Sequence, residues 1–272
     1  MKALYWAPVH GQTGTTSNLL ATALVAGQYF SKRGLITQTH FNYNNLEAPL
    51  LEANADNNRY RKYFREIGID ALARNIKVER LSEEWLDYCC TDIANSNMKL
   101  LPGTTQTVRE SFDHEMEIIM IPLLKAIEIY CDHIFIDISS GCNPLSMKLM
   151  READIVIINL SQNMNVINLF FESYKDKLPN KVFYLLGNYD DRSKYNLSNI
   201  RKRYHKHINS KNSGSIPYNT GYRDAQADGK AADFIRNNLL CKKKDPNYFF
   251  IQETIKSTAK ILKLAGVIVE KE

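Results

Sequence analysis

The sequence has 272 residues, of which 44% are hydrophobic and 24% are charged, and its net charge at pH 7 is +5. This composition is typical of a soluble globular protein, and so mild a basic charge does not by itself indicate a nucleic-acid partner. The longest uninterrupted apolar run, residues 118–124, is too short to cross a membrane. The chain also becomes polar soon after residue 9, so we expect no signal peptide at that point.

Five cysteines occur with neither the spacing of a zinc site nor the pattern of a disulfide framework. We expect all of them to be reduced, in a cytoplasmic protein. Cys142 follows a glycine, but no histidine is placed by a motif to activate it as a nucleophile, so a structural role is favoured. The five are Cys89, Cys90, Cys131, Cys142 and Cys241.

The first segment of the chain, residues 3–8, predicts a short buried strand, and residues 18–32 predict a helix with one apolar side. The segment between them consists of His10, Gly11, Gln12, Thr13, Gly14, Thr15, Thr16 and Ser17. A strand, a glycine-containing loop and a Ser/Thr-rich helix start form the layout of a phosphate-binding loop. In such a loop, backbone N–H groups and the helix N-terminus create an anion site.

One residue of the usual phosphate-binding loop is missing. A lysine normally precedes the Ser/Thr and neutralises the β- and γ-phosphates, and Thr15 stands at that position. Because Thr15, Thr16 and Ser17 are also good N-cap residues, an ordinary helix-capping turn is the alternative interpretation.

Apolar strands and helices alternate through the rest of the chain, which predicts an α/β fold with a parallel sheet buried on both faces. Without a linker or an internal repeat, we expect one domain over residues 1–272. The predicted strands are 35–41, 98–101, 133–137, 154–160 and 181–186. The predicted helices are 46–54, 59–74, a helix capped by Ser82, 110–130, 144–151, 166–177, pieces of 218–240, and 248–265.

Asp137 ends the strand 133–137 and is followed by a turn that includes Gly141. Open α/β sheets bind ligands at this end of their strands. In enzymes with a phosphate-binding loop, a carboxylate here holds the Mg²⁺ shell and Thr16 would supply a hydroxyl ligand. The alternative is an aspartate that only caps the next turn.

At this point the chain resembles the ParA/MinD class of deviant P-loop ATPases, including its CpaE and TadZ branch associated with pilus assembly. The stretches that carry the resemblance are residues 3–17, 100–103, 130–137, 153–157, and 216–225 with 229–230. The resemblance implies a P-loop NTPase-like α/β fold, with a mostly parallel central sheet and helices on both faces. It also implies ATP or ADP with Mg²⁺ at the loop, and a homodimer that closes face to face around two nucleotides.

The resemblance also assigns positions to individual residues. The loop, with Gly11, Gly14, Thr15 and Thr16 in phosphate-binding positions, would bind the nucleotide, and Thr16 with Asp137 would hold the metal. Gly141 would face the γ-phosphate, Asn188 would contact adenine, and Pro217 and Tyr218 would flank the base.

Three charged groups of the family pattern are absent. His10 replaces the signature lysine that reaches the partner's phosphates, and Thr15 replaces the P-loop lysine. Residues 40–44 stand where carboxylates, one of which positions the attacking water, are expected after the second strand. Because losing one oriented donor costs about 10²–10³ in rate, we expect impaired hydrolysis with retained nucleotide binding. Lys2, Lys230 or a partner's arginine are candidates for a replacement cation.

These features favour an ATP-binding, dimeric scaffold that positions a larger assembly, such as a pilus or secretion apparatus, at a cell site. The alternative is an active ParA-type ATPase in DNA partition or cell-site positioning. The basic run 201–207 predicts either DNA-phosphate binding or a solvated helix face, the latter favoured. MinD-like proteins bind membrane with a C-terminal amphipathic helix, but the apolar face of the terminal helix here is modest and favours packing on the sheet.

Overall fold

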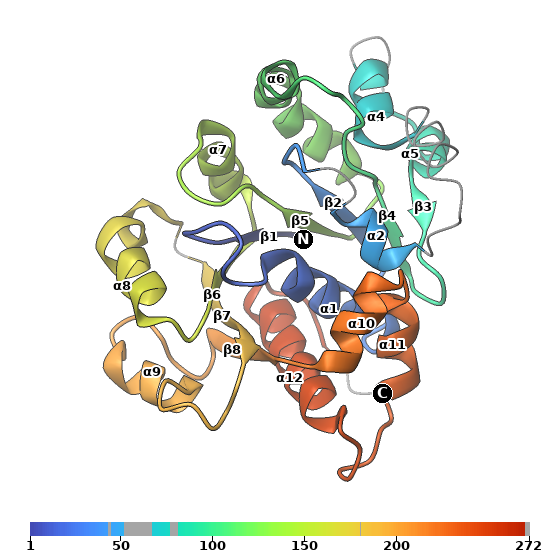
Figure 1. Ribbon diagram of the computed structural model, residues 1–272. Coiled ribbons are helices and arrows are strands. Elements are labelled where there is room, and N and C mark those ends of the chain that lie inside the picture. The colour runs from blue at the N-terminus through green and yellow to red at the C-terminus, as the bar shows by residue number, and fades with distance from the viewer. Residues whose placement is uncertain (43–44, 52–66, 77–80, 180, 270–272) are drawn as a thin grey trace.

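A single sheet of eight strands forms the centre of the protein, and helices cover both of its faces (Figure 1). The computed structural model describes residues 1–42, 45–51, 67–76, 81–179 and 181–269. The strands are β1 (Lys2–Trp6), β2 (Gly34–Gln38), β3 (Thr91–Asp92), β4 (Met98–Leu100), β5 (His133–Asp137), β6 (Ile155–Leu160), β7 (Val182–Tyr189) and β8 (Ser213–Pro217).

Helices connect most of these strands. They are α1 (Thr15–Gln28), α2 (Glu47–Leu50), α4 (Gly68–Ile76), α5 (Glu83–Cys89), α6 (Arg109–Ile127), α7 (Pro144–Glu152), α8 (Met164–Ser173), the 3₁₀ helix η1 (Lys175–Lys177), α9 (Leu197–Arg203), α10 (Thr220–Ala227), α11 (Ala231–Asn238) and α12 (Tyr248–Leu264). Parts of the predicted helices 46–54 and 59–74 lie outside the described residues. Within the described residues, no helix is long and apolar enough to span a membrane.

The strand order is β3-β4-β2-β5-β1-β6-β7-β8, and every neighbouring pair is parallel except β3 with β4. This arrangement confirms the predicted α/β fold with a mostly parallel sheet. Strand β1 lies at the centre, with β5 on one side and β6 on the other. The register pairs Tyr5 with Asp137, so the carboxyl ends of β1 and β5 meet at one edge of the sheet.

Two apolar clusters bury the sheet because successive side chains of a strand point to opposite faces. On β1, Leu4 and Trp6 join the cluster that includes residues of α6, α7 and α8, whereas Ala3 and Tyr5 join the cluster with α1, α11 and α12. All five residues of β1 are buried. Strand β1 is therefore covered on both faces, as is usual for a strand inside a parallel sheet.

Several details of the predicted elements are corrected. The edge strand β8 was not predicted, because Ser213, Gly214 and Ser215 lack the apolar character of a buried strand. It is held by parallel pairing with β7 and by Ser257 of α12, whose hydroxyl accepts from the Ser215 N–H at 3.0 Å and donates to its carbonyl at 2.9 Å. Helix α12 thus packs on the sheet, as favoured. The predicted N-cap Ser82 is confirmed, since its hydroxyl accepts from the Trp85 N–H.

Candidate functional site

The loop between β1 and α1 has two residues in the left-handed backbone region, Gly11 at φ +74° and Gly14 at φ +67°. Glycine adopts this conformation without strain. A Cβ added at Gly11 would meet nothing within 4 Å, so the outer side of the loop is open. The chain therefore folds into a turn whose backbone is accessible to a ligand.

Helix α1 begins at Thr15, three residues earlier than predicted, and its N-cap is Gly14, which supplies no side-chain cap. Thr15, Thr16 and Ser17 therefore form the first turn of the helix, and the alternative in which they act as N-caps is wrong. That first turn contains no acidic residue. Its free N–H groups and the positive end of the helix dipole remain available to an anion.

Buried amides hold the loop in place. The Asn18 side chain, 2% exposed, donates to the Thr13 carbonyl at 3.1 Å and to Oδ1 of Asn159 at 2.9 Å. Gly187 of β7 lies directly beneath, and a Cβ added there would clash with the Thr13 carbonyl oxygen. The loop is thus fixed by α1, β6 and β7 together.

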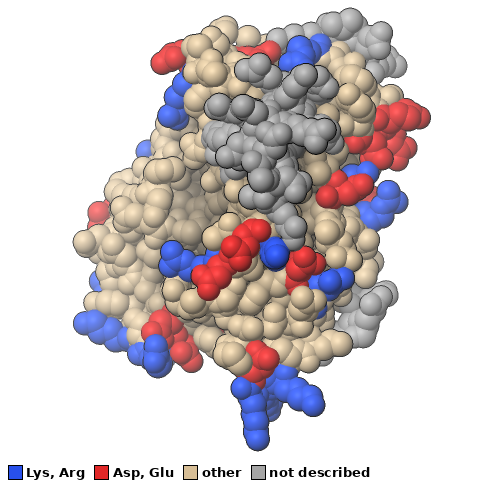
Figure 2. Space-filling model, turned by 45° about the vertical axis from the view of Figure 1, so that its right-hand side comes forward, with Lys and Arg blue, Asp and Glu red and all other residues tan. Residues whose placement is uncertain are grey.

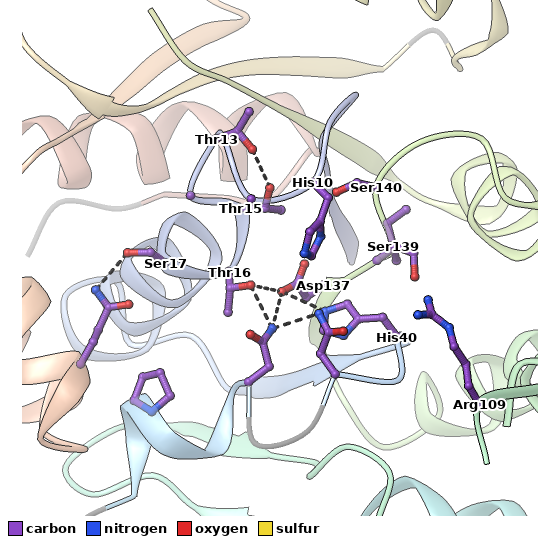
Figure 3. Close-up of a pocket in the computed structure, with 17 residues that line it drawn as sticks. His10, Thr13, Thr15, Thr16, Ser17, His40, Arg109, Asp137, Ser139 and Ser140 are labelled. Carbon is purple, nitrogen blue, oxygen red and sulfur yellow. Dashed lines mark hydrogen bonds and ion pairs between the residues drawn. The ribbon is translucent and has the colours of Figure 1, made fainter. Parts of the chain in front are cut away.

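Asp137, which is 2% exposed, is the centre of a small polar cluster (Figure 3). The Thr16 hydroxyl donates to its Oδ2 at 2.6 Å. Asn45 Nδ2 donates to Thr16 Oγ1 at 3.0 Å and lies 3.4 Å from Asp137 Oδ2, and His40 Nε2 lies 3.4 Å from the same oxygen. The pair predicted to hold a metal is therefore in direct contact. The structure does not support an Asp137 that serves only to cap the next turn.

A cavity of about 690 Å³ opens at this edge of the sheet, within the usual size range of a small-molecule site. The predicted residues that line it are His10, Gly11, Thr13, Gly14, Thr15, Thr16, Ser17 and Asp137. The phosphate loop and the predicted metal pair therefore share one cavity.

Five predicted site residues do not belong to that cavity lining: Gln12, Gly141, Asn188, Pro217 and Tyr218. The Gly141 N–H donates to the Ala7 carbonyl at 3.0 Å, so in this structure it faces the chain rather than a ligand. Its neighbours Ser139 and Ser140 line the cavity instead.

The predicted base-binding residues lie together at the carboxyl ends of β7 and β8. Asn188, in the left-handed region at φ +48°, has its Nδ2 3.4 Å from the position of a Cβ added at Gly14, so it borders the loop. Pro217 pairs with Tyr189 of the neighbouring strand. The Tyr218 ring is 50% exposed and lies 5.5 Å from the Arg223 guanidinium.

Other cavity residues were not predicted as site residues. His40 and Asn45 follow β2, Arg109 begins α6, and Gln226 of α10 donates to the Ser17 hydroxyl at 3.0 Å. For His40 the sequence did offer a signal, because His40 begins the segment in which the family pattern has carboxylates. Nothing in the sequence pointed to Arg109, which reaches the cavity only through the tertiary fold.

The candidate cation Lys2 is excluded by its position. Its Nζ is bound to Glu128 Oε2 at 2.9 Å, and Lys2 is at the amino end of β1, away from the loop that follows the carboxyl end. Lys230, at the N-cap position of α11, does not contribute to the described lining of the cavity either.

A mostly parallel sheet with a glycine-containing loop after its central strand and a carboxylate at the end of the adjacent strand is the arrangement of a P-loop NTPase fold. No protein-family model and no curated protein matches the sequence. Among solved structures, the chain is similar to the septum site-determining protein MinD complexed with Mg-ADP from Pyrococcus horikoshii, at 17% identity and a TM-score of 0.68. The alignment covers 98% of each chain.

Two further structures show the same fold. A ParA family ATPase from Chlorobium tepidum has 13% identity and a TM-score of 0.64, over 95% of this chain and 98% of that one. The ATP complex of a McdA variant from Cyanothece has 14% identity and a TM-score of 0.63, over 100% and 99%. The protein therefore has the ParA/MinD type of P-loop fold.

Proposed function

We propose that this protein binds ATP or ADP with Mg²⁺ in the cavity at the carboxyl ends of β1 and β5. The observation that carries the proposal is that one cavity contains both the open phosphate loop and the Thr16–Asp137 pair. Structures of the same fold are known as a complex with Mg-ADP and as a complex with ATP, which supports the same ligand class here.

The residues present fit a magnesium nucleotide. Mg²⁺ is bound through oxygen ligands, usually one or two protein groups together with substrate phosphates. The Thr16 hydroxyl and the Asp137 carboxylate are both oxygen donors and lie 2.6 Å apart. Thr16 would bind the metal directly and Asp137 would hold it directly or through water. When bound, the metal neutralises phosphate charge.

Hydrolysis is proposed to be impaired. His10 and Thr15 line the cavity where the family pattern has lysines, and His40 lies against Asp137 in the segment where carboxylates are expected. Phosphoryl transfer depends on positioned charge, and each missing donor costs about 10²–10³ in rate. Binding depends instead on backbone N–H groups, the helix dipole and the Thr16–Asp137 pair.

The proposed output is positioning. We propose a homodimer, in the cytoplasm or peripheral to the membrane or cell pole, that binds protein partners of a positioning, pilus or secretion system, as in the CpaE and TadZ branch. Support comes from the MinC:MinD cell division protein complex of Aquifex aeolicus, which has the same fold, at 14% identity and a TM-score of 0.65. That alignment covers 100% of this chain and 98% of the other.

The surface gives less support to a nucleic-acid partner. Figure 2 shows Lys and Arg interspersed with Asp and Glu on one face, with a basic projection at its lower edge. Figure 1 places the connection between α11 and α12 at that edge, and it contains Lys242, Lys243 and Lys244. On α9, Arg201 is turned inward, with its Nε donating to the Ser213 hydroxyl at 2.8 Å. The basic run thus contributes partly to packing.

Calorimetric titration with ATP and Mg²⁺ tests the nucleotide site. Wild-type protein should bind saturably, and Thr16→Ala should weaken binding about tenfold or more, because it removes both a metal ligand and the partner of Asp137. Thr220→Ala is the matched control, since Thr220 also lies in the first turn of a helix, α10, but does not line the cavity. No binding by wild type at millimolar ATP would refute the proposal.

Turnover distinguishes the scaffold from an active ATPase. We expect purified protein to release phosphate at a rate close to the uncatalysed background. Robust turnover that Asp137→Ala abolishes would instead support an active ParA-type ATPase in partition or cell-site positioning.

A further inference from the structure

The cavity has few formal charges. Among the described residues that line it, Arg109 is the one Lys or Arg and Asp137 is the one Asp or Glu. A nucleoside triphosphate retains negative charge after binding one Mg²⁺, and a cationic side chain beside its terminal phosphate would stabilise that remaining charge. The positions where the family pattern places lysines hold His10 and Thr15.

Arg109 reaches the cavity from the side opposite the loop. Figure 3 shows its guanidinium extending from the start of α6 toward Ser139, in the turn that follows Asp137, while the loop approaches from the other side of Asp137. Thr16 and Asp137, the proposed metal pair, lie between the loop and Arg109. A phosphate chain that begins in the loop and continues past the metal therefore ends on the Arg109 side.

The position of Arg109 is unfavourable for the helix that carries it. It is the first residue of α6, where the positive end of the helix dipole disfavours a cation. Its ion pair with Asp113, one turn later at 3.4 Å, is exposed, with 64% and 53% of the two side chains accessible. Exposed pairs of this kind contribute little and are easily exchanged for another anion. Helix stability alone therefore does not account for an arginine here.

We propose that Arg109 binds the terminal phosphate of a nucleoside triphosphate and so makes the site discriminate ATP from ADP. This inference rests on the proposed nucleotide site. The guanidinium would donate two N–H groups to the phosphate oxygens, a geometry that arginine provides and lysine does not. The cation absent from the loop is thereby supplied by the same chain from a distant helix.

Calorimetric dissociation constants for ATP and ADP, each with Mg²⁺, test this assignment. Arg109→Ala should weaken ATP binding about tenfold, the effect of losing one charge-assisted contact, and change ADP binding less than about twofold. Arg109→Lys should recover part of the loss. Asp113→Asn, which removes the competing carboxylate, should strengthen ATP binding by about two- to threefold.

Arg236→Ala is the matched control, because Arg236 also pairs with a carboxylate on its own helix, Asp233, and does not line the cavity. If the ratio of ATP affinity to ADP affinity were the same in wild type and in Arg109→Ala, the inference about Arg109 would be overturned. The proposed nucleotide site would not be affected by that result. Absence of ATP binding in wild type would overturn both. Thermal melting of each variant checks that it is folded. Because the Arg109 side chain is exposed, we expect its substitution to leave the fold intact.

Discussion

The phosphate end of the proposed nucleotide site is fixed by backbone and buried amides, whereas two of the three proposed base-binding residues, Asn188 and Tyr218, are exposed at the surface. Thr13 is 1% exposed and Asn18 is 2% exposed, while Tyr218 is 50% exposed. A displacement of Thr13 would break its hydrogen bond from Asn18, and there is no room for a side chain between Thr13 and Gly187. We therefore predict that the phosphates would contribute more of the nucleotide's binding energy than the base.

The largest expected effect comes from filling the space beneath the loop. In Gly187→Ala the new Cβ would clash with the Thr13 carbonyl oxygen and lie 2.5 Å from Asn18 Nδ2, so the loop must shift. Overpacking of this kind costs about 1–3 kcal/mol of stability, and we expect ATP binding to fall at least tenfold. Melting temperature and calorimetric titration measure the two effects.

Gly34→Ala separates stability from binding. A Cβ on Gly34 would clash with the His133 carbonyl oxygen, an equally close approach to backbone, but at the amino ends of β2 and β5. This variant should have a lower melting temperature than wild type, while its folded form should bind ATP with the affinity of wild type. If both glycine variants bound ATP alike, the special rigidity of the phosphate end would be refuted.

A smaller effect is expected at the base end. Tyr218→Ala removes a ring that is half exposed and already in contact with Arg223, so ATP affinity should fall only about two- to threefold. Affinity for inorganic tripolyphosphate should be unchanged. Tyr88→Ala, which removes a ring of similar exposure (53%) stacked on Trp85, is the control. If Tyr218→Ala lowered ATP affinity more than tenfold, the prediction that the base end contributes less to binding than the phosphate end would be wrong.

The smallest effect concerns pH. Burial, reinforced by the nearby N-terminal amino group, lowers the pKa of His133, at the amino end of β5. The unfolded chain therefore binds this proton more readily than the folded one, and stability rises with pH in the window just below the unfolded pKa of about 6.5. Acidification through that window should lower the melting temperature, and His133→Gln should reduce the slope.

His133 lies at the amino end of β5, whereas the cavity opens at the carboxyl ends, so His133→Gln should leave ATP affinity unchanged. His114→Gln, at an exposed position on α6, is the control and should leave the slope unchanged. An identical slope in wild type and His133→Gln would contradict the prediction.

The order of elements along the chain could be predicted because apolar strands and amphipathic helices carry strong periodic signals. Strand β5 is predicted with its observed bounds, and helix α6 within three residues at each end. The strand β8 could not be predicted, since small polar residues are buried there by contacts with α12 that are distant in sequence. The start of α1 was misplaced because Thr and Ser are compatible with both a cap and a first turn.

The sequence by itself determined the two halves of the phosphate end, the glycine-containing loop after the first strand and Asp137 at the end of another. Both are local patterns, and parallel strands bring their carboxyl ends to one edge. Only the tertiary structure decided that Thr16 contacts Asp137, that His40 and Asn45 join them, and that Arg109 reaches the same cavity. The physical reason is that such contacts join residues as much as 121 positions apart, and their position depends on register and packing rather than on local sequence preference.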